Sequence, residues 1–487
     1  MSAKPAASDS RLPASALRTI VALIFGGIAA ILDSTIVTIA LHQLTVDLHS
    51  TTADIQWVST AYLLAMAAAI PVTGWAQARF GGKRAWMAAL AIFVLASIAC
   101  AASWNDTSLI AFRVVQGFGA GLIFPLMQTL AIQAIGTDVP LEVRGRAVAA
   151  ISMPLALGPI LGPVLGGVIL NWLSWRWLFL VNVPLIAAGL VLAWRLLPAD
   201  RPAAAAPRAR LDVLGLALLA PALTGILLGL SNTAAAGGFW RADVIIPLAG
   251  GIALLTAFAV RSLRSGARSL VDVTLLRSRS LASSSAVLFA AGAALYAGMF
   301  LLPLYWQDLR GDSVLAAAFL LIPQGVGALA SRTVAARLTP RLGARTVTIG
   351  AFALAAAATV PFAVAGAGTS VWWLAMVLFI RGLGMGAVLI PPMMVAYDDL
   401  APAQVPHATM ITRISQQVGA SFGIAIVAVA LQTLARSGAT SGFQGAFWWT
   451  VGITLAAIGP ALAFRGSRPA AKAAAPATGP ERVKAAA

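Results

Sequence analysis

Long apolar stretches, separated by short polar segments, run along almost the whole chain. A helix that crosses a membrane needs about 20 consecutive apolar residues, and the pattern predicts fourteen such spans. Their expected bounds are 18–41, 55–78, 85–103, 108–131, 147–170, 177–198, 212–232, 243–262, 281–305, 314–335, 346–365, 371–396, 407–433 and 443–464. The alternative is twelve spans, if the seventh and eighth are not membrane helices. The pattern therefore predicts an all-α integral membrane protein.

The composition agrees with this fold class. Of 487 residues, 60% are hydrophobic and only 10% are charged, whereas a soluble domain is about 45–50% apolar and about 25% charged. The net charge of +17 would favour nucleic-acid binding in a soluble protein. Here the basic residues lie between apolar runs, so no nucleic-acid partner is expected. One cysteine and three scattered histidines predict neither a disulfide within the chain nor a metal site, and no cofactor is expected.

The basic residues also predict how the spans are oriented. Most of the 33 Lys and Arg residues fall on the same side as both termini, and the other side carries only Arg176, Arg241, Arg310 and Arg436. Because Lys and Arg are enriched in cytoplasmic loops, we expect a multi-pass protein of the cell (inner) membrane with both termini cytoplasmic. The N-terminal segment 1–17 and a disordered basic tail, 465–487, would lie on that side.

Two stretches of sequence occur twice in the same order. The segment GWAQARFGGKR (Gly74–Arg84) is echoed by ARLTPRLGAR (Ala336–Arg345). Further along, RVVQGFGAGLIFP (Arg113–Pro125) is echoed by RGLGMGAVLIPP (Arg381–Pro392). Chance similarity between glycine-rich helices is the alternative, but the matching order of a loop motif and an Arg–Gly pattern argues against it.

The repeat predicts two related six-helix halves, 18–198 and 281–464. The segment between them, 199–280, would hold linkers and two inserted membrane helices. Related halves of this kind are typical of transporters that rock about a central site.

Six motifs, taken in order, resemble those of a known family. They are LDSTIVTIAL, GWAQARFGGKR, FRVVQGFGAG, GPILGPVLGG, WRWLFLVNVP and PLYWQDLRGDSVLAAAFLLIP. Over nearly its whole length the chain is similar to the fourteen-span drug:proton antiporters of the EmrB/QacA type, within the major facilitator superfamily. The resemblance implies the major facilitator fold and a secondary transporter that exports hydrophobic or cationic small molecules in exchange for protons by alternating access.

Such multidrug efflux would confer antibiotic resistance. The alternative is export of one specific metabolite, antibiotic or siderophore. The expected partners are the lipid bilayer, protons and a small-molecule substrate, and the resemblance also admits a periplasmic adaptor protein.

Four charged residues lie away from the ends of the predicted spans: Asp33, Arg113, Arg381 and Arg413. At about 1.5 Å per residue, Asp33 and Arg113 both lie roughly 8 Å from the outer edge of a core about 30 Å thick. They meet if spans one and four touch, as in the fold that the resemblance implies. Buried charges usually mark ion or substrate pathways, so we interpret the pair as a proton-coupling site. A static ion pair that locks two helices is the alternative.

The other two intramembrane arginines differ in depth. Arg381 lies near mid-membrane, where it either binds substrate or hydrogen-bonds unwound backbone. Arg413 is expected nearer the cytoplasmic edge, with its charged head reaching toward water.

Binding cavities of the resembled family are apolar and aromatic. Candidates for lining such a cavity, besides Arg381, are Met153, Phe289, Tyr296, Phe300, Tyr305 and Trp306. Each of them is equally compatible with ordinary packing.

The fifth predicted span carries two stripes of small and helix-breaking residues. Small residues let a neighbouring helix approach closely, and each proline favours a kink, so we expect a bent and tightly packed helix. Its resemblance to the antiporter motif implies a specific role in exchange. On a helix, the two stripes comprise Gly158, Gly162 and Gly166, and beside them Pro159, Pro163 and Gly167.

The first copy of the loop motif has a residue that departs from the family. The family has an Asp, which latches the gate, where this chain has Ala78 and, in the second copy, Pro340. The basic residues of the loop can still meet helix dipoles or lipid headgroups. The resemblance implies a cytoplasmic gate formed by Gly74, Arg79, Gly81, Lys83 and Arg84.

Other function classes lack their chemistry in this sequence. A primary pump needs a nucleotide site, and no G-x-x-x-x-G-K-[ST] motif occurs. An enzyme needs a cluster of acids, bases or nucleophiles, which isolated intramembrane charges do not form. A channel or receptor is not expected to combine duplicated halves with an antiporter motif. We therefore expect a transporter and not an enzyme.

Overall fold

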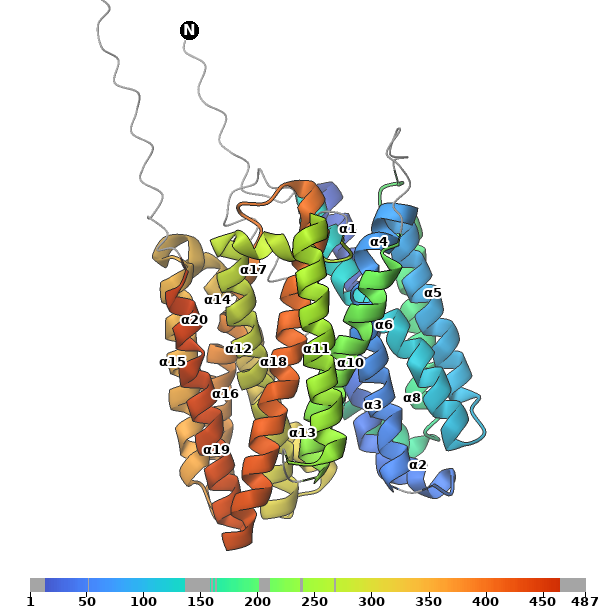
Figure 1. Cartoon of the computed structure of the whole chain (residues 1–487). Helices are drawn as coiled ribbons and strands as arrows, with labels where there is room; N and C mark the ends of the chain where they lie inside the picture. Colours follow the sequence, from blue (N-terminus) through green and yellow to red (C-terminus); the bar gives the residue numbers. More distant parts are fainter. Residues whose placement is uncertain are drawn as a thin grey trace, which may run out of the picture.

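The computed structural model describes residues 14–50, 52–135, 158, 161–162, 164–200, 211–236, 240–266 and 269–464. Every regular element in these ranges is helical, and the helices form one bundle (Figure 1). The described chain starts and finishes at the same end of this bundle, which also holds the loop motif and is called the loop-motif end here. The other end, where α2 lies, is called the opposite end.

The helices before residue 200 form the first group. They are α1 (Ala14–Ile36), η1 (Val37–Ala40), α2 (Leu41–Asp47), α3 (Thr52–Ala69), α4 (Val72–Phe80), α5 (Gly82–Ala101), α6 (Asp106–Ile135), α8 (Trp177–Leu180) and α9 (Asn182–Leu196). A pair of long helices follows, with a short 3-10 turn after it: α10 (Val213–Ala236), α11 (Ala242–Ser265) and η3 (Val273–Arg277).

The remaining helices form the second group. They are α12 (Arg279–Leu304), η4 (Tyr305–Leu309), α13 (Val314–Leu320), α14 (Ile322–Leu342), α15 (Ala344–Val364), α16 (Val371–Val388), α17 (Ile390–Val395), η5 (Pro402–Gln404), α18 (Val405–Leu434), η6 (Ala435–Ser437), α19 (Ala439–Ala456) and α20 (Ile458–Leu462).

The described residues contain 12 stretches that are long and apolar enough to cross a membrane, or 13 if the bent pair α3–α4 is one span. Each of them corresponds to a span predicted from the sequence. The predicted fifth span, 147–170, lies mostly outside the described residues. The chain is therefore a multi-pass helical membrane protein, and the count of fourteen stays a prediction.

Prolines divide some predicted spans. The second one, 55–78, is not one straight helix, because α3 ends at Ala69 and α4 begins at Val72 with a bend of 55° between them. A proline has no N–H, and its ring clashes with the carbonyl four residues earlier, so the helix breaks at Pro71. The hydropathy pattern does not register this break because the apolar run continues through it.

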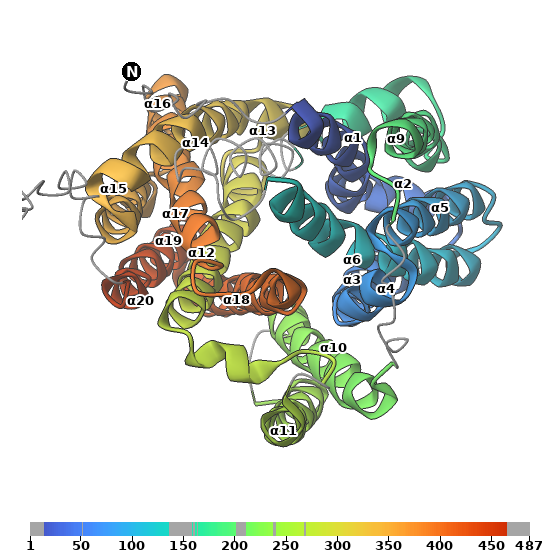
Figure 2. The ribbon, with the colours of Figure 1, turned by 90° about the horizontal axis from the view of Figure 1, so that it is seen from above.

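The first and second groups lie beside each other, with α10 and α11 at the edge between them (Figure 2). Helix α10 packs against α11, α3 and α18, so it touches both groups. Asp212, just before α10, accepts hydrogen bonds from Arg261 of α11 (2.7 Å) and from the N–H groups of Gly215 (2.8 Å) and Leu270 (3.1 Å). Burial raises the pKa of the Asp212 carboxyl, but these bonds outweigh it and hold that pKa below its ordinary value.

The close approach of neighbouring helices is the same in the two groups. A Cβ atom at Gly117 of α6 would meet a backbone carbonyl of α3, and one at Gly382 of α16 would meet a carbonyl of α14. Helices α4 and α14 end alike, at Gly81 with φ 91° and at Gly343 with φ 85°, a left-handed region that favours glycine. The internal repeat is therefore present in the backbone as well as in the sequence.

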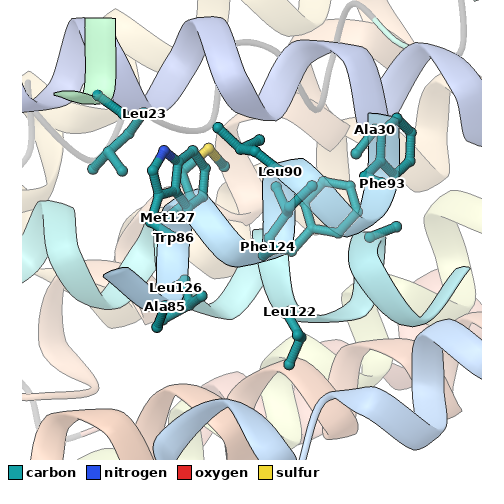
Figure 3. Packing of buried hydrophobic residues seen from close by; sticks show 14 of the residues in the cluster. Leu23, Ala30, Ala85, Trp86, Leu90, Phe93, Leu122, Phe124, Leu126 and Met127 are labelled. Carbon is teal, nitrogen blue, oxygen red and sulfur yellow. The ribbon is translucent and has the colours of Figure 1, made fainter. Parts of the chain in front are cut away.

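Apolar packing fixes α1 against α5 and α6 (Figure 3). Trp86 and Leu90 of α5 lie where Gly26 of α1 leaves room for them, and Met127 of α6 lies against Gly27. Because lipid is as apolar as these side chains, such contacts stabilise through van der Waals packing rather than by leaving water. They set the position of α1, and with it the position of its one acidic residue.

One apolar cluster joins the two groups at the loop-motif end. It brings Ile70 and Ile132 of the first group together with Met410 and Ile411 of α18, and Gly74 of α4 also lies beside Met410. The described clusters toward the opposite end each stay within one group. In this conformation the two groups therefore close against each other at the loop-motif end.

Replacing Gly121 or Gly386 by alanine is expected to destabilise the bundle, because the new Cβ would meet carbonyl oxygens of α3 or α14. Overpacking of this kind costs about 1–3 kcal/mol. The matched controls are Gly350→Ala and Gly452→Ala, where nothing lies within 4 Å of the new atom and alanine favours the helix. Thermal unfolding in detergent should give lower midpoints for the first two variants only; four equal midpoints would refute the close-packing account.

Candidate functional site

Asp33 and Arg113 meet in the interior of the first group. Asp33 lies in the last turn of α1, and Arg113 lies two turns into α6. The Nη1 atom of Arg113 is 2.6 Å from Oδ2 of Asp33. Both residues are buried, because Asp33 is 0% exposed and Arg113 is 1% exposed. The sequence predicts that Asp33 and Arg113 lie at the same depth in the membrane, and the structure shows that they are in contact.

Two amides and a hydroxyl complete the surroundings of this ion pair. Gln116 accepts a hydrogen bond from Nη1 of Arg113 (2.7 Å), and its Nε2 donates to Oδ1 of Asp33 (3.0 Å) and to Oγ of Ser97 (2.6 Å). Asn182, at the start of α9, donates from Nδ2 to the same Oδ1 of Asp33 (2.8 Å). Both carboxylate oxygens thus have partners, as a charge buried away from water requires.

Arg113 is also held from the side of α3. Its Nε donates to the carbonyl of Val58 (3.0 Å), and its guanidinium carbon lies 3.9 Å from the ring centroid of Tyr62. The face of an aromatic ring attracts a cation, so these neutral partners hold Arg113 independently of Asp33. The network as a whole joins α1, α3, α5, α6 and α9.

Sequence reasoning identified the two charges of this network and missed its neutral members. Gln116 comes three residues after Arg113, a spacing that puts both side chains on one helix face. Asn182 belongs to the motif WRWLFLVNVP. The spacing of Gln116 and the motif that contains Asn182 could therefore have indicated these two residues. No feature of the sequence distinguishes Ser97 and Tyr62 from other polar residues within the spans.

One atom of the network lacks a partner. Among the described residues, Oδ1 of Asn182 is buried and accepts no hydrogen bond. It belongs to the amide whose Nδ2 donates to Asp33, so a half-turn of that amide presents an acceptor to Asp33. A protonated carboxyl has an O–H to donate. The site can therefore satisfy Asp33 in either protonation state.

Arg381 is equally buried, with 1% exposed, but all its partners are neutral. Its Nε donates to Oγ1 of Thr359 (3.1 Å), its Nη1 to Oε1 of Gln324 (2.8 Å) and its Nη2 to the carbonyl of Ala294 (3.4 Å). These groups come from α15, α14 and α12. Arg381 therefore bonds within the protein, which favours a structural role over substrate binding.

The candidates for an aromatic cavity do not all lie together, although Phe300 packs against the cluster that holds Tyr305 and Trp306. Tyr305 and Trp306 are fully buried in an aromatic cluster of the second group, a position that favours packing. Met153 falls outside the described residues. The candidates that are partly exposed, all on α12, are Phe289, Tyr296 and Phe300.

Two glycines of the antiporter motif lie against α1, close to the network. A Cβ at Gly158 would meet Ile31, and one at Gly162 would meet Thr35, whose Oγ1 donates to the Gly158 carbonyl (2.9 Å). Ile31 and Thr35 share one face of α1, and Asp33 between them points the other way. The fifth span and the network therefore contact α1 from opposite sides. In the rest of the motif, the helical segment 164–172 holds Gly166 and Gly167, and the residues outside the described ranges are Pro159 and Pro163.

The loop motif connects the ends of α4, α5 and α9. The carboxylate of Asp200 lies against Gly81 and accepts hydrogen bonds from the N–H groups of Lys83 (2.9 Å) and Arg84 (3.1 Å) at the start of α5. The Nζ atom of Lys83 donates to two carbonyls at the end of α9 (2.5 and 3.0 Å). A carboxylate at a helix N-terminus and an ammonium at a C-terminus are both favourable.

Asp200 thus gives the loop a carboxylate, although the position where the family has its acid is Ala78. Ala78 and Arg79 are exposed, and the guanidinium of Arg79 lies near the ring of Phe80. Gly74 lies at the contact with α18 described above. Among the described side chains, no group of three or more His, Cys, Asp and Glu is arranged to hold a metal ion.

Two related groups of membrane helices that close against each other at one end and bury charged residues in their interiors are typical of membrane transporters. The chain belongs to the Major Facilitator Superfamily, whose profile matches residues 23–424. It is accordingly a transporter and not an enzyme.

Relatives and solved structures agree with this assignment. The chain is 36% identical to a multidrug resistance protein B homolog of Mycobacterium tuberculosis (strain ATCC 25618 / H37Rv) over 423 residues, which cover 86% of this chain and 77% of the relative. The human organic anion transporter MFSD10 (TETRAN) aligns with a TM-score of 0.63 at 16% identity, over 92% of this chain and 100% of that one. The proton:xylose symporter XylE gives 0.62 at 14% identity, over 91% and 94%. At these identities the two structures show the fold alone.

Arg113→Met is expected to destabilise the protein, because it leaves the buried carboxylate of Asp33 without its cation. Removing one partner of a buried ion pair costs about 3–5 kcal/mol. The double variant with Asp33→Asn should recover part of this loss, since no charge then remains unpaired. Thermal unfolding of the purified protein measures both variants, and a double variant no more stable than Arg113→Met would contradict this explanation.

Asp200→Ala is expected to loosen the loop motif, because it removes the carboxylate that caps α5. Loss of such a cap costs about 0.5–2 kcal/mol, so limited trypsin digestion after Lys83 and Arg84 should become faster. The matched control is Asp47→Ala, which removes an exposed carboxylate of α2. Equal digestion rates in the two variants would mean that other contacts hold the loop.

Proposed function

We propose that this chain exports hydrophobic small molecules in exchange for protons, with Asp33 as the proton-binding group. The observation that carries the proposal is the buried contact of Asp33 with Arg113, at the centre of a network that joins five helices. Ionisable groups at membrane depth usually serve ion or substrate pathways. The likeness to a multidrug resistance relative supports small molecules as cargo.

The exchange begins when a proton binds the carboxylate of Asp33. Asp33 then loses its attraction for Arg113, while Gln116, the Val58 carbonyl and the Tyr62 ring still hold the guanidinium. Asn182 turns its free Oδ1 toward the new O–H group. The new O–H group of Asp33 thus has an acceptor when the ion pair opens, and an unsatisfied buried O–H would cost about 1–3 kcal/mol.

Opening of the ion pair releases one side of α1. The other side stays packed against the fifth span through Gly158 and Gly162, so α1 and the fifth span move together relative to α6. Alternating access further requires the cluster around Ile70 and Met410 to separate at the loop-motif end. The two helix groups then rock against each other.

The proposal includes the topology expected from the sequence. It comprises fourteen spans, with α10 and α11 as an inserted pair between two six-helix halves, in the cell membrane with both termini cytoplasmic. In this orientation the loop-motif end faces the cytoplasm and is closed. The resemblance extends the cargo to cationic molecules, the alternative is export of one specific metabolite, antibiotic or siderophore, and a periplasmic adaptor protein would serve passage through an outer membrane.

Asp33→Asn is expected to abolish proton-driven export, because an amide has nearly the size and shape of the carboxyl group but cannot bind and release a proton. Everted vesicles with an imposed proton gradient measure uptake of fluorescein, rhodamine 6G and ethidium, with and without a protonophore. Uptake by the variant should fall to the protonophore level for every dye that the wild type transports.

The matched control is Asp243→Asn, which changes an exposed acid that pairs with Arg241. It should keep the uptake of the wild type. Normal membrane insertion of Asp33→Asn together with full proton-driven uptake would rule out Asp33 as the coupling group.

A further inference from the structure

Arg413 lies between the two groups of helices, just inside the contact that closes the loop-motif end. It is one turn along α18 from Met410, which lies beside Gly74 of α4. Its guanidinium carbon is 4.9 Å from the ring centroid of Phe124 on α6. The side chain therefore turns toward the other group of helices, whereas the sequence predicted that it reaches outward to water.

The guanidinium of Arg413 has open donor positions. Its Nη1 donates to Oε1 of Gln416, one turn along the same helix (2.7 Å). Among the described residues Nε and Nη2 have no acceptor, yet they are not enclosed, and the side chain is partly exposed. Arg381, by contrast, places Nε, Nη1 and Nη2 each on an acceptor. Of these two arginines, Arg413 is therefore the one that can receive a further partner.

The charges inside the predicted spans are mostly positive. Asp33 is the one acid that lies away from the ends of those spans, and it is already bonded within its own network. Along α6, Arg113 and Phe124 are 11 residues apart, which at about 1.5 Å per residue separates Asp33 from Arg413 by roughly 16 Å. A cation that enters beside Arg413 meets repulsion and finds no described carboxylate there.

We propose that Arg413 binds the anionic group of the transported molecule, and that the cargo is an amphipathic organic anion such as an aromatic carboxylate. The two open donors, Nε and Nη2, lie on one edge of a planar guanidinium, and this edge matches the two oxygens of a carboxylate. The ring of Phe124 provides an aromatic surface for the rest of the molecule.

This inference rests on the proposed export function and narrows its cargo to hydrophobic acids. Because the cargo site and the proton site lie roughly 16 Å apart along α6, cargo and proton do not compete for one group. Their coupling then passes through the movement of the helices that separate Asp33 from Arg413.

Two probes with the same rings and opposite charge test the proposal: anthracene-9-carboxylate and 9-(aminomethyl)anthracene. Their fluorescence anisotropy reports binding to the purified full chain in an uncharged detergent, with no proton gradient. The wild type should bind the carboxylate at least about ten-fold more tightly than the amine, as expected for charge-assisted hydrogen bonds. Arg413→Gln should lose this preference, and Arg413→Lys should keep part of it because the charge remains but the planar fork does not.

The matched control is Arg436→Gln, which removes an exposed arginine just beyond the same helix and should bind both probes as the wild type does. Carboxylate binding that is absent in the wild type, no tighter than amine binding, or unchanged in Arg413→Gln would overturn the proposal. Thermal unfolding shows whether Arg413→Gln is folded. If it is not, Arg413→Lys decides, and carboxylate binding by this variant equal to that of the wild type would overturn the proposal.

The outcome is separable from that of the proposed function, because this binding needs no proton coupling. Carboxylate binding that depends on Arg413, together with full export by Asp33→Asn, would remove the coupling role and leave the anion site. If Asp33→Asn loses export but probe binding does not depend on Arg413, the anion site alone is ruled out.

Discussion

The constraint on which this structure depends is that lipid offers no hydrogen-bond partner to a buried charge. Helix α1 alone cannot provide hydrogen-bond donors for Asp33, so its two oxygens accept hydrogen bonds from α6 and α9. The α6 side chains that donate to Asp33 are in turn bonded to Ser97 of α5 and to the Val58 carbonyl of α3. Five helices must therefore keep their crossing positions for one carboxylate to be tolerated. The same dependence works in reverse: any change in the charge of Asp33 acts on all five helices at once. In the proposed exchange, a proton that binds Asp33 therefore acts on all the helices of this network.

The sequence predicts the elements that rest on one-dimensional patterns. Apolar runs locate the helices, and glycines repeated at the same spacing reveal the duplicated halves, because close approach of two backbones requires a missing side chain at a fixed place. Depth along a helix brings Asp33 and Arg113 to one level. Helix breaks such as that at Pro71 escape prediction since hydropathy does not change there. The neutral partners of the ion pair escape as well, because which Ser, Gln or Asn reaches a charge depends on how several helices cross.

The loop motif shows a similar limit. The sequence reveals that the expected acid is absent at Ala78, but not that another carboxylate takes a place in the same loop. Asp200 lies more than a hundred residues further along and reaches the start of α5 because α9 ends beside it. Two oppositely charged side chains then sit at two helix ends of opposite polarity, each where the helix dipole favours it. The chemistry of a motif can thus be supplied from a distant segment, which no inspection of the motif alone reveals.

The two halves use matching positions for different chemistry. Gln116 and Arg381 each come one residue before the glycine that brings α6 or α16 against its neighbour, and each bonds a hydroxyl of the adjacent helix. On α1, Asp33 lies midway between the two residues that contact glycines of the antiporter motif. The matching position on α12 is Ala291, which lies midway between the two residues that contact glycines of α18. The second half therefore buries a cation on neutral acceptors where the first half buries a carboxylate. Amides, hydroxyls and carbonyls do not titrate near neutral pH, so the partners of Arg381 do not respond to a proton, whereas in the proposed exchange Asp33 does.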